Sequence, residues 1–513
     1  MEILLSGAGV LVLYGFTLAI YRLYLGPLAK IPGPKIAALS SWYNAYYDLV
    51  AGGQYVWKIR EMHEKYGPVV RTRPDAVHIS DPLFIDKIYS QSPKQRRERA
   101  HTILNMLQSP GSILATKDHD LHRRRRAVIN PYFSQQNVRR LEPVINTTLA
   151  NLFRRMDGWA KDGHPVHMNK VFRAATKDVI QAYALGDGQR CLDEEDCNAA
   201  FFDVMTPQRI IHLGTHVYWL AKLLASLPPE IMSRLIPRVA VFMRFMEDLT
   251  EEIKTIRKAK DHPESKTIFH EIMRSDNLPA SEKETHRLAD EAMVLIIAGS
   301  ETTAFTLVAI IYLMLADRKA LNRLKAELAT VMDGCKDSIP SAAELDSLPY
   351  LNSVIQEAIR VYPGATHRQD RIAPDEDLVY KNPHTGEEIV IPAGTVIGMS
   401  APIVNRDKNI YGERADEFWP DRYLENPKLR QHQFAFSKGT RQCIGMNLAY
   451  QELQTFVAGI FHKYDLYDST RKKQSGPTLE LFQTGLKDIE MDGDYITPSV
   501  VPGSEGLRII VRN

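Results

Sequence analysis

The sequence predicts a mainly helical α+β protein with small β-sheets, preceded by one N-terminal helix that is long enough to cross a membrane. Apolar residues recur every three or four positions through most of residues 56–360, which is the period of an amphipathic helix. Segments with strand character are short, and the last third of the chain is irregular and rich in proline. Strands are expected at residues 69–71, 77–79, 379–380, 389–391 and 507–511. This pattern is typical of a helical domain with small sheets at its edges.

The N-terminal segment predicts a transmembrane anchor over residues 1–22. Residues 3–21 contain no charge, and a helix of that length, at about 1.5 Å per residue, spans about the hydrocarbon thickness of a bilayer. A cleaved secretory signal is the alternative, but no basic residue precedes the run and no small-x-small cleavage site follows it. Three basic residues follow before the next acid, Asp48, which favours a cytosolic location for the rest of the chain.

The remaining chain is expected to form one domain. Glycine and proline at 26–27 and 31–34 predict a proline-rich hinge over residues 23–38, and no comparable linker or internal repeat occurs in residues 39–513. The net charge of +2 gives no reason to expect a nucleic-acid partner. The four cysteines are too few for a disulfide framework and lack paired metal-ligand spacing.

The segment from Phe436 to Gly445 (FSKGTRQCIG) is the first candidate for chemistry. Helical apolar spacing begins just after it, so Cys443 is expected in a loop before a helix N-terminus, where backbone N–H groups favour a thiolate. Gly445 permits close approach of a flat ligand, and Phe436 is placed to pack beside the sulfur. The alternative is an ordinary buried cysteine that acts as a small hydrophobic residue.

Residues 291–315 form the second candidate, because they are apolar on nearly every face and therefore predict a buried helix. Gly299 and Glu301 are unusual in such a helix, since glycine weakens helices and a carboxylate is rarely buried without a partner. Thr302 is placed either to bond back to the carbonyl of Ala298 or to leave that carbonyl free for a ligand. A Ser/Thr-rich helix without function is the alternative.

Two further charged segments each have an ordinary explanation. Glu357 and Arg360 are three residues apart on a predicted helix, and such pairs are usually surface ion pairs worth less than about 1 kcal/mol. Residues 119–126 (HDLHRRRR) are compatible with a solvated basic helical face.

Taken together, these segments resemble the cytochrome P450 family. The first matches the family's cysteine loop F-x-x-G-x-R-x-C-x-G, and the second matches its oxygen-activation motif A/G-G-x-D/E-T-T. Glu357 and Arg360 match E-x-x-R, and all the motifs stand in the family's order along the chain. The resemblance implies the cytochrome P450 fold and a haem-thiolate monooxygenase, most similar to fungal microsomal members of secondary metabolism such as trichodiene oxygenase.

The resemblance also implies roles for individual residues. Cys443 would ligate the iron of haem b in a site that includes Phe436 and Gly445, Gly299 would make room for dioxygen, and Glu301 and Thr302 would relay protons. The residues implied in a structural network are Glu357, Arg360 and Arg422. The residues implied at the haem propionates are Arg126, Arg371 and Arg441, with His122 where the family has tryptophan in W-x-x-x-R.

The partners follow from the same resemblance. The sequence has no convincing dinucleotide-binding fingerprint, so NADPH would act through NADPH-cytochrome P450 reductase, with cytochrome b5 as a further candidate donor. Arg123, Arg124 and Lys438 form a candidate docking patch, with solvated surface as the alternative. The implied pocket residues Met106, Leu107, Ile113, Phe202 and Phe482 favour a lipophilic small-molecule substrate.

The expected location is the endoplasmic reticulum membrane, with a single span and a cytosolic catalytic domain. Two other functions stay open, namely a haem-thiolate isomerase or dehydratase and a non-catalytic haem sensor. The Glu301-Thr302 pair argues against the first, because an isomerase needs no oxygen. NADPH consumption with a supplied reductase would distinguish the second.

Overall fold

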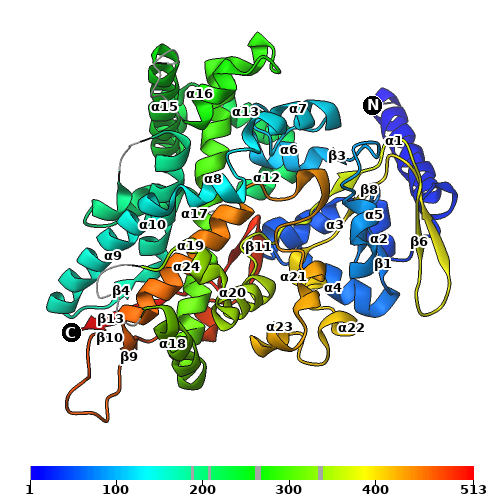
Figure 1. The fold of residues 1–513 in the computed structure, drawn as a ribbon. Coiled ribbons are helices and arrows are strands. Elements are labelled where there is room, and N and C mark those ends of the chain that lie inside the picture. Colours follow the sequence, from blue (N-terminus) through cyan, green and yellow to red (C-terminus); the bar gives the residue numbers. More distant parts are fainter. Residues whose placement is uncertain (1, 187–189, 206–209, 260–266, 333–338) are drawn as a thin grey trace.

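The structure is a computed structural model that describes residues 2–186, 190–205, 210–259, 267–332 and 339–513. The N-terminus and the C-terminus lie at opposite ends of the molecule (Figure 1). Most helices gather on the side of the C-terminus, and the largest sheet lies on the side of the N-terminal helix α1 (Figure 1).

Helices dominate the described chain. The longer helices are α1 (Glu2–Ile20), α4 (Tyr55–Tyr66), α7 (His119–Ile129), α9 (Glu142–Asp162), α10 (Met168–Ala184), α15 (Pro237–Lys258), α17 (Thr285–Ala316), α18 (Arg318–Met332), α20 (Pro349–Val361) and α24 (Met446–Lys463). The shorter ones are α2 (Lys35–Leu39), α3 (Trp42–Ala45), α5 (Ile85–Ile88), α6 (His101–Leu107), α8 (Gln135–Arg139), α11 (Ala199–Met205), α12 (Ile210–His216), α13 (Tyr218–Ala225), α14 (Pro229–Leu235), α16 (Ile268–Arg274), α19 (Ala342–Asp346), α21 (Ala401–Val404), α22 (Lys408–Tyr411) and α23 (Asp421–Glu425). Single turns of π- or 3₁₀-helix occur at η1 (Tyr21–Leu25), η2 (Tyr46–Val50), η3 (Pro82–Phe84), η4 (Cys191–Asp193), η5 (Ala280–Lys283), η6 (Pro427–His432), η7 (Gly439–Arg441) and η8 (Leu486–Asp488).

The strands form small sheets, as the sequence predicts. The largest has the order β1-β2-β8-β5-β3, from β1 (Val69–Arg73), β2 (Ala76–Ile79), β8 (Val396–Gly398), β5 (Arg371–Ile372) and β3 (Glu98–Arg99). A second has the order β4-β13-β10-β9, from β4 (Val166–His167), β13 (Arg508–Arg512), β10 (Thr478–Leu481) and β9 (Asp465–Leu466). Two hairpins pair β6 (Leu378–Lys381) with β7 (Glu388–Ile391), and β11 (Gly493–Tyr495) with β12 (Thr497–Ser499).

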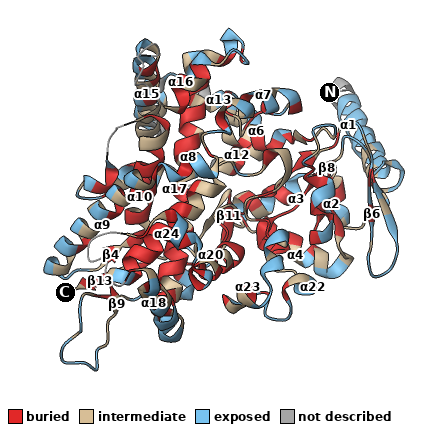
Figure 2. Cartoon of the chain, in the orientation of Figure 1, coloured by how far each residue is buried: buried red, intermediate tan, exposed pale blue. Residues whose placement is uncertain are grey.

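Helices α10, α17 and α24 form the centre of the main core, where most of their residues are buried (Figure 2). Helices α10 and α17 approach closely at Gly299, where an added Cβ would lie 2.8 Å from Cγ1 of Ile180. The Thr176 hydroxyl donates to the backbone carbonyl of Ser300 at 2.9 Å in the same contact. Helix α17 is thus fixed in position by its neighbours, which sets the direction in which its exposed residues face.

The N-terminal helix differs from the core because its apolar residues are exposed (Figure 2). Residues 5–25 and helix α17 are both long and apolar enough to cross a membrane, but α17 is mostly buried within the protein. The segment after α1 is packed on β1, where Leu28 and Ile31 are buried and the Arg71 N–H donates to the Pro32 carbonyl at 2.7 Å. The proline-rich segment predicted as a hinge is therefore attached to the sheet.

The sequence predicted the long helices and the strongest strands. Helices α17, α20 and α24 and strands β1, β2, β6, β7 and β13 lie where they were expected. Strands β3, β4, β5 and β9 were not predicted, because two residues carry no period and such strands form only by pairing with distant segments. Strands β8, β10, β11 and β12, of three or four residues, were not predicted either.

Candidate haem-thiolate site

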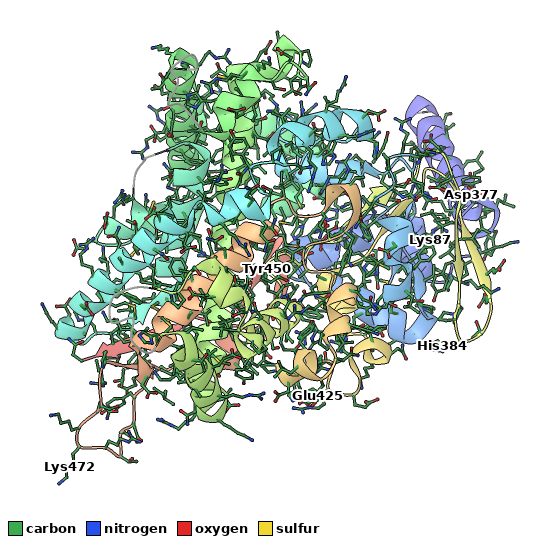
Figure 3. All side chains as sticks on the ribbon, viewed as in Figure 1. Lys87, Asp377, His384, Glu425, Tyr450 and Lys472 are labelled. Atoms are coloured by element: carbon green, nitrogen blue, oxygen red, sulfur yellow. The ribbon has the colours of Figure 1, made fainter. Side chains whose placement is uncertain are left out.

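The cysteine loop lies directly before the N-terminus of α24. The Cys443 N–H donates to the Phe436 carbonyl at 2.9 Å, which closes the loop back on itself. Gly439 has a φ of +76°, and an added Cβ would collide with the carbonyl of Tyr89. Glycine is therefore required there by both conformation and space. Phe436 packs on Tyr450 of α24 with ring centroids 5.4 Å apart (Tyr450 is labelled in Figure 3).

Cys443 is exposed, although protein surrounds it closely enough to desolvate its thiol. Desolvation raises the pKa of the Cys443 thiol, and the Gly445 N–H and the Arg126 guanidinium oppose this increase. The helix N-terminus thus acts in the direction that the sequence predicted but does not by itself produce a thiolate. A coordinated metal ion would favour the thiolate, because metal coordination deprotonates a thiol. No atom lies within 4 Å of a Cβ added to Gly445, so the backbone there is open to a ligand.

Buried arginines gather beside this loop. Arg441 donates to the carbonyls of Thr116 at 2.6 Å and Lys117 at 2.7 Å, and Arg371 donates to the Ser437 hydroxyl at 3.3 Å. Arg126 on α7 donates to the Gln442 carbonyl at 2.6 Å, next to Cys443. The structure therefore brings all three arginines that the sequence predicted to the cysteine loop.

Arg99 is a fourth arginine of this cluster, and the sequence analysis missed it. It stands directly opposite Arg371 in the β3–β5 ladder, where like charges destabilise a sheet. Its Nε is buried without a partner, and burial together with Arg371 and Arg441 lowers its pKa. In the described part of the chain, none of Arg99, Arg371 and Arg441 forms an ion pair with a carboxylate within 4.0 Å. Asp370 acts on Arg99 and Arg371, and Glu98 and Asp118 act on Arg441, only at longer range. An anionic ligand would compensate these buried positive charges.

His122 lies in the same place as a buried, neutral side chain. Burial lowers the pKa of the His122 imidazole, and the nearby positive charges of Arg441, Arg126, Arg99 and Arg371 lower it further. A neutral imidazole keeps one N–H donor and so retains the hydrogen-bonding capacity of the tryptophan that the family motif has at this position. Its role at a propionate stays a prediction.

Helix α17 is less buried at Ala298 and Thr302 than along most of its length. Ala298 is exposed although most of the helix around it is buried, and the Thr302 hydroxyl donates to the Ala298 carbonyl at 2.9 Å. Of the two arrangements considered from sequence, the structure has the one in which Thr302 bonds back to the helix. Gly364 packs on this turn, since an added Cβ would lie 2.6 Å from the Thr302 carbonyl oxygen.

Glu301 is buried and paired. Its Oε2 lies 2.9 Å from Nε of Arg173 on α10, whereas its Oε1 is buried without a partner. Burial raises the pKa of the Glu301 carboxyl, and Arg173 opposes this increase. A Cβ added to Gly299, two residues earlier, would lie 2.8 Å from Cγ1 of Ile180, which gives helix packing as one reason for glycine there. Its expected role in making room for dioxygen stays a prediction.

Glu452 on α24 is a second buried acid that the sequence analysis did not select. It is hydrogen-bonded to Thr303 of α17, next to Thr302, while its Oε1 has no partner. Burial raises the pKa of the Glu452 carboxyl well above its usual value. The signal was a glutamate within the apolar stretch 446–461, where a carboxylate is rarely buried.

The structure brings Glu357, Arg360 and Arg422 together in the interior. Glu357 accepts two hydrogen bonds of 2.7 Å from Arg360 and one of 3.3 Å from Arg422. The Trp419 N–H also donates to Glu357 at 2.9 Å. All three charged side chains are at most 4% exposed, so this is a buried network and not the surface ion pair that was the alternative.

These features fit a haem with a thiolate ligand. A cysteine sulfur is a suitable axial ligand for haem iron, and two propionates match a cluster of buried arginines that lacks carboxylate partners. The backbone at Gly445 leaves space for a flat ring close to the loop. The fold and the site therefore define a haem-thiolate protein.

Comparison with known proteins agrees with this class. The sequence model of the family described as Cytochrome P450 matches residues 40–487, so the chain belongs to the cytochrome P450 family. The chain is 36% identical over 505 residues to cytochrome P450 monooxygenase tpcC of Cochliobolus heterostrophus, covering 98% of this chain and 95% of that protein. It is 37% identical over 516 residues to cytochrome P450 monooxygenase astB of Talaromyces wortmannii, covering 98% and 96%. It is 35% identical over 512 residues to tryptophan 6-hydroxylase fscE of Fusarium equiseti, covering 98% and 96%.

Solved structures share the fold. Cytochrome P450 CYP102L1 aligns with a TM-score of 0.70 at 17% identity, covering 91% of this chain and 96% of the other. The retinoic acid bound cyanobacterial CYP120A1 aligns with a TM-score of 0.67 at 17% identity, covering 88% and 93%. The predicted cytochrome P450 fold is thus confirmed, and the protein is a cytochrome P450 monooxygenase similar to fungal enzymes of secondary metabolism.

Proposed function

We propose that this monooxygenase inserts one oxygen atom from O₂ into a lipophilic small molecule of fungal secondary metabolism. The observation that carries the proposal is Cys443 in its loop before α24, next to buried arginines without carboxylate partners. Haem b bound through Cys443 would supply the activation of O₂, because thiolate donation favours O–O cleavage. Arg99, Arg371 and Arg441 would hold its propionates, with Arg126 and His122 beside them.

Protons would reach the oxygen site through side chains of α17. The Thr302 hydroxyl lies on the exposed turn with Ala298 and can accept and donate a hydrogen bond. Glu301 is adjacent, and its raised pKa brings the carboxyl closer to the pH at which it can exchange a proton. Arg173 would keep Glu301 in position, since it binds one carboxylate oxygen and leaves the other without a partner.

The substrate would be lipophilic because the pocket residues that the family resemblance implies are apolar. Met106 on α6 is buried, and Ile113 and Phe305 pack against the same core as α17. The proposed chemistry is oxidation of a C–H or C=C bond, with no particular substrate inferred; one similar protein is named a tryptophan 6-hydroxylase.

Electrons would come from NADPH-cytochrome P450 reductase, with cytochrome b5 as a second donor. Arg123 and Arg124 are exposed on α7, within one turn of Arg126, which contacts the cysteine loop. Lys438 lies in that loop. A basic surface next to the cysteine suits an acidic redox partner.

The N-terminal helix would anchor the protein in the endoplasmic reticulum membrane as a single span. Its apolar residues are exposed, and residues 5–25 have the length and hydropathy of a spanning segment. The anchor, residues 1–22, would leave the monooxygenase domain, residues 39–513, on the cytosolic side, joined by residues 23–38.

Reconstitution tests this function directly. Purified protein, in lipid vesicles with a fungal reductase, is supplied with NADPH and a lipophilic extract from a host in which the gene is deleted. We expect a product that gains one oxygen atom, with ¹⁸O incorporated from ¹⁸O₂. Products without ¹⁸O would point to an isomerase or dehydratase, and absence of reductase-dependent NADPH consumption with every extract would point to a haem sensor.

A further inference from the structure

One cluster of titratable side chains consists of Asp48, His212 and His216, and we refer to it as the His–Asp cluster. Its residues are far along the chain from Cys443. Asp48 lies on η2, and the two histidines lie four residues apart on α12, so their side chains share one helix face. The His216 Nε2 lies 2.9 Å from Asp48 Oδ2, and the His212 Nδ1 lies 3.9 Å from the same oxygen. One ligand atom from each residue lies within 4.8 Å of the others.

Two atoms of this cluster are buried and carry lone pairs that have no hydrogen-bond partner. The His212 Nε2 lies 2.7 Å from the Asp494 carbonyl oxygen, which can only accept, so Nε2 carries the proton. The neutral ring then has its lone pair on Nδ1, which points toward Asp48 and has no hydrogen-bond partner. Asp48 Oδ1 also has none. Both atoms are buried acceptors with a free lone pair, so each can bind a cation.

The surroundings of the cluster hold these side chains in place. The Asp494 carbonyl bond fixes the tautomer of His212, as backbone carbonyls do for metal-binding histidines. Arg368 donates to Asp48 Oδ2 at 3.1 Å, which leaves Oδ1 as the free oxygen. Gly214, between the two histidines, lies so close to the Asn105 carbonyl of α6 that an added Cβ would collide with it. Helix α12 is thereby held in position.

A cavity provides access from solvent. It has a volume of about 290 Å³ and reaches the cluster at His216, which forms part of its wall. The other lining residues are Ser41, Trp42, Ala45, Arg73, Asp75, His101, Thr102 and Thr215. Since a water molecule occupies about 30 Å³ of liquid, this space admits a hydrated ion.

We propose that the His–Asp cluster is a Zn²⁺ site, with His212 Nδ1, His216 Nε2 and a carboxylate oxygen of Asp48 as protein ligands and a water from the cavity as the fourth ligand. Two imidazole nitrogens and one carboxylate are a ligand set of Zn²⁺, whereas Mg²⁺ and Ca²⁺ prefer oxygen. At Zn–ligand distances of about 2.0–2.1 Å, tetrahedral ligand atoms are about 3.3 Å apart. The ligand atoms of the cluster lie within 4.8 Å of one another, so the side chains move closer together when the ion binds.

Three properties of the site follow. Zn²⁺ takes the position of the proton between His216 and Asp48, and in a neutral ring that proton moves to Nδ1 of His216. The positive charge of Arg368 on the same carboxylate repels the ion and makes this site weaker than a closed structural zinc site. Bound Zn²⁺ joins η2 to α12, which protects the backbone amides of α12 from hydrogen exchange.

The test measures metal binding by the full-length, haem-loaded protein. After treatment with EDTA, the protein is dialysed against graded Zn²⁺, and zinc and iron are quantified together by mass spectrometry. We expect one zinc per iron, unaffected by excess Mg²⁺, and a loss of at least about 100-fold in zinc affinity in His216→Gln and His212→Gln. His101→Gln is the matched control, because His101 lines the same cavity outside the cluster, and its affinity should be unchanged.

The carbon monoxide difference spectrum of each variant checks that it is folded and haem-loaded, independently of zinc. If His212→Gln does not fold, His216→Gln carries the test, because its side chain lies at the cavity wall. Equal zinc affinity in the wild type and His216→Gln would overturn the proposal, as would an equal loss in His101→Gln. These results leave the monooxygenase assignment untouched, since they do not depend on turnover.

Discussion

Replacing Glu357 with glutamine removes one negative charge from the buried network and changes the shape of the side chain very little. Glu357 Oε1 accepts from Arg360, Arg422 and Trp419, and Oε2 accepts from Nε of Arg360. A glutamine offers one acceptor oxygen and one NH₂ donor. If the oxygen keeps the three donors at Oε1, the NH₂ group faces the Arg360 Nε–H, and two buried guanidinium groups lose their counter-charge.

The magnitude follows from burial. Removing one partner of a buried ion pair costs about 3–5 kcal/mol, because an uncompensated charge stays in the interior. Arg414 and Glu417 are a matched control, since they are also three residues apart with a 2.7 Å contact, but their side chains are 49% and 58% exposed. An exposed pair of this kind is worth about 0.2–1 kcal/mol. Glu357→Gln should therefore destabilise the protein by about 3 kcal/mol more than Glu417→Gln, a large share of a typical stability of about 5–15 kcal/mol.

The assay is urea unfolding of the haem-loaded protein, followed by tryptophan fluorescence and by the carbon monoxide difference band. The two signals should fall together and at lower urea in Glu357→Gln, whereas Glu417→Gln should unfold close to the wild type. Equal midpoints for the two variants would refute the reasoning, because burial would then not decide the strength of the pair.

Three further predictions concern the haem-thiolate site. Cys443→Ser should retain the fold by circular dichroism but lose the carbon monoxide band that is characteristic of thiolate ligation; an unchanged band would contradict ligation by Cys443. Thr302→Ala should lower product formed per NADPH by at least about tenfold and release hydrogen peroxide instead, while Thr302→Ser, which keeps the hydroxyl, should stay coupled; tight coupling in both would exclude a proton relay through Thr302. Arg99→Met should speed haem loss to a haem-scavenging globin by about 10–100-fold, since a charge-assisted hydrogen bond is worth about 1.5–3 kcal/mol, and the exposed Arg123→Met should not; equal rates would remove Arg99 from the site.

The apolar patterns along the chain predicted the long helices, because their periodicity is local. The stretch 291–315 lies within α17, and the helix after Cys443 begins at Met446 as α24. The strands at 69–71 and 389–391 were found for the same reason. The short strands β3 and β5 could not be found, although they place Arg99 opposite Arg371. Their pairing joins segments more than 270 residues apart, which no local pattern encodes.

The sequence likewise predicted only those parts of the candidate site that consist of consecutive residues. The cysteine loop was predicted because its residues are consecutive and its glycines meet a local need, as the φ of +76° at Gly439 shows. The partner of Glu301 was not, because Arg173 reaches it from α10 across a helix contact. Gly299 was noted as unusual in a helix, but only the packing on Ile180 shows the steric demand at that position.

By itself, the sequence determined the helical class, the cysteine loop, the buried helix α17 and the family, since each depends on residues close together in the chain. Only the tertiary structure decided that Glu357, Arg360 and Arg422 form one buried network, that Arg99 joins the arginine cluster, and that Asp48 meets His212 and His216. The physical reason is that burial and charge compensation depend on distance in space, and a sequence read alone gives only distance along the chain.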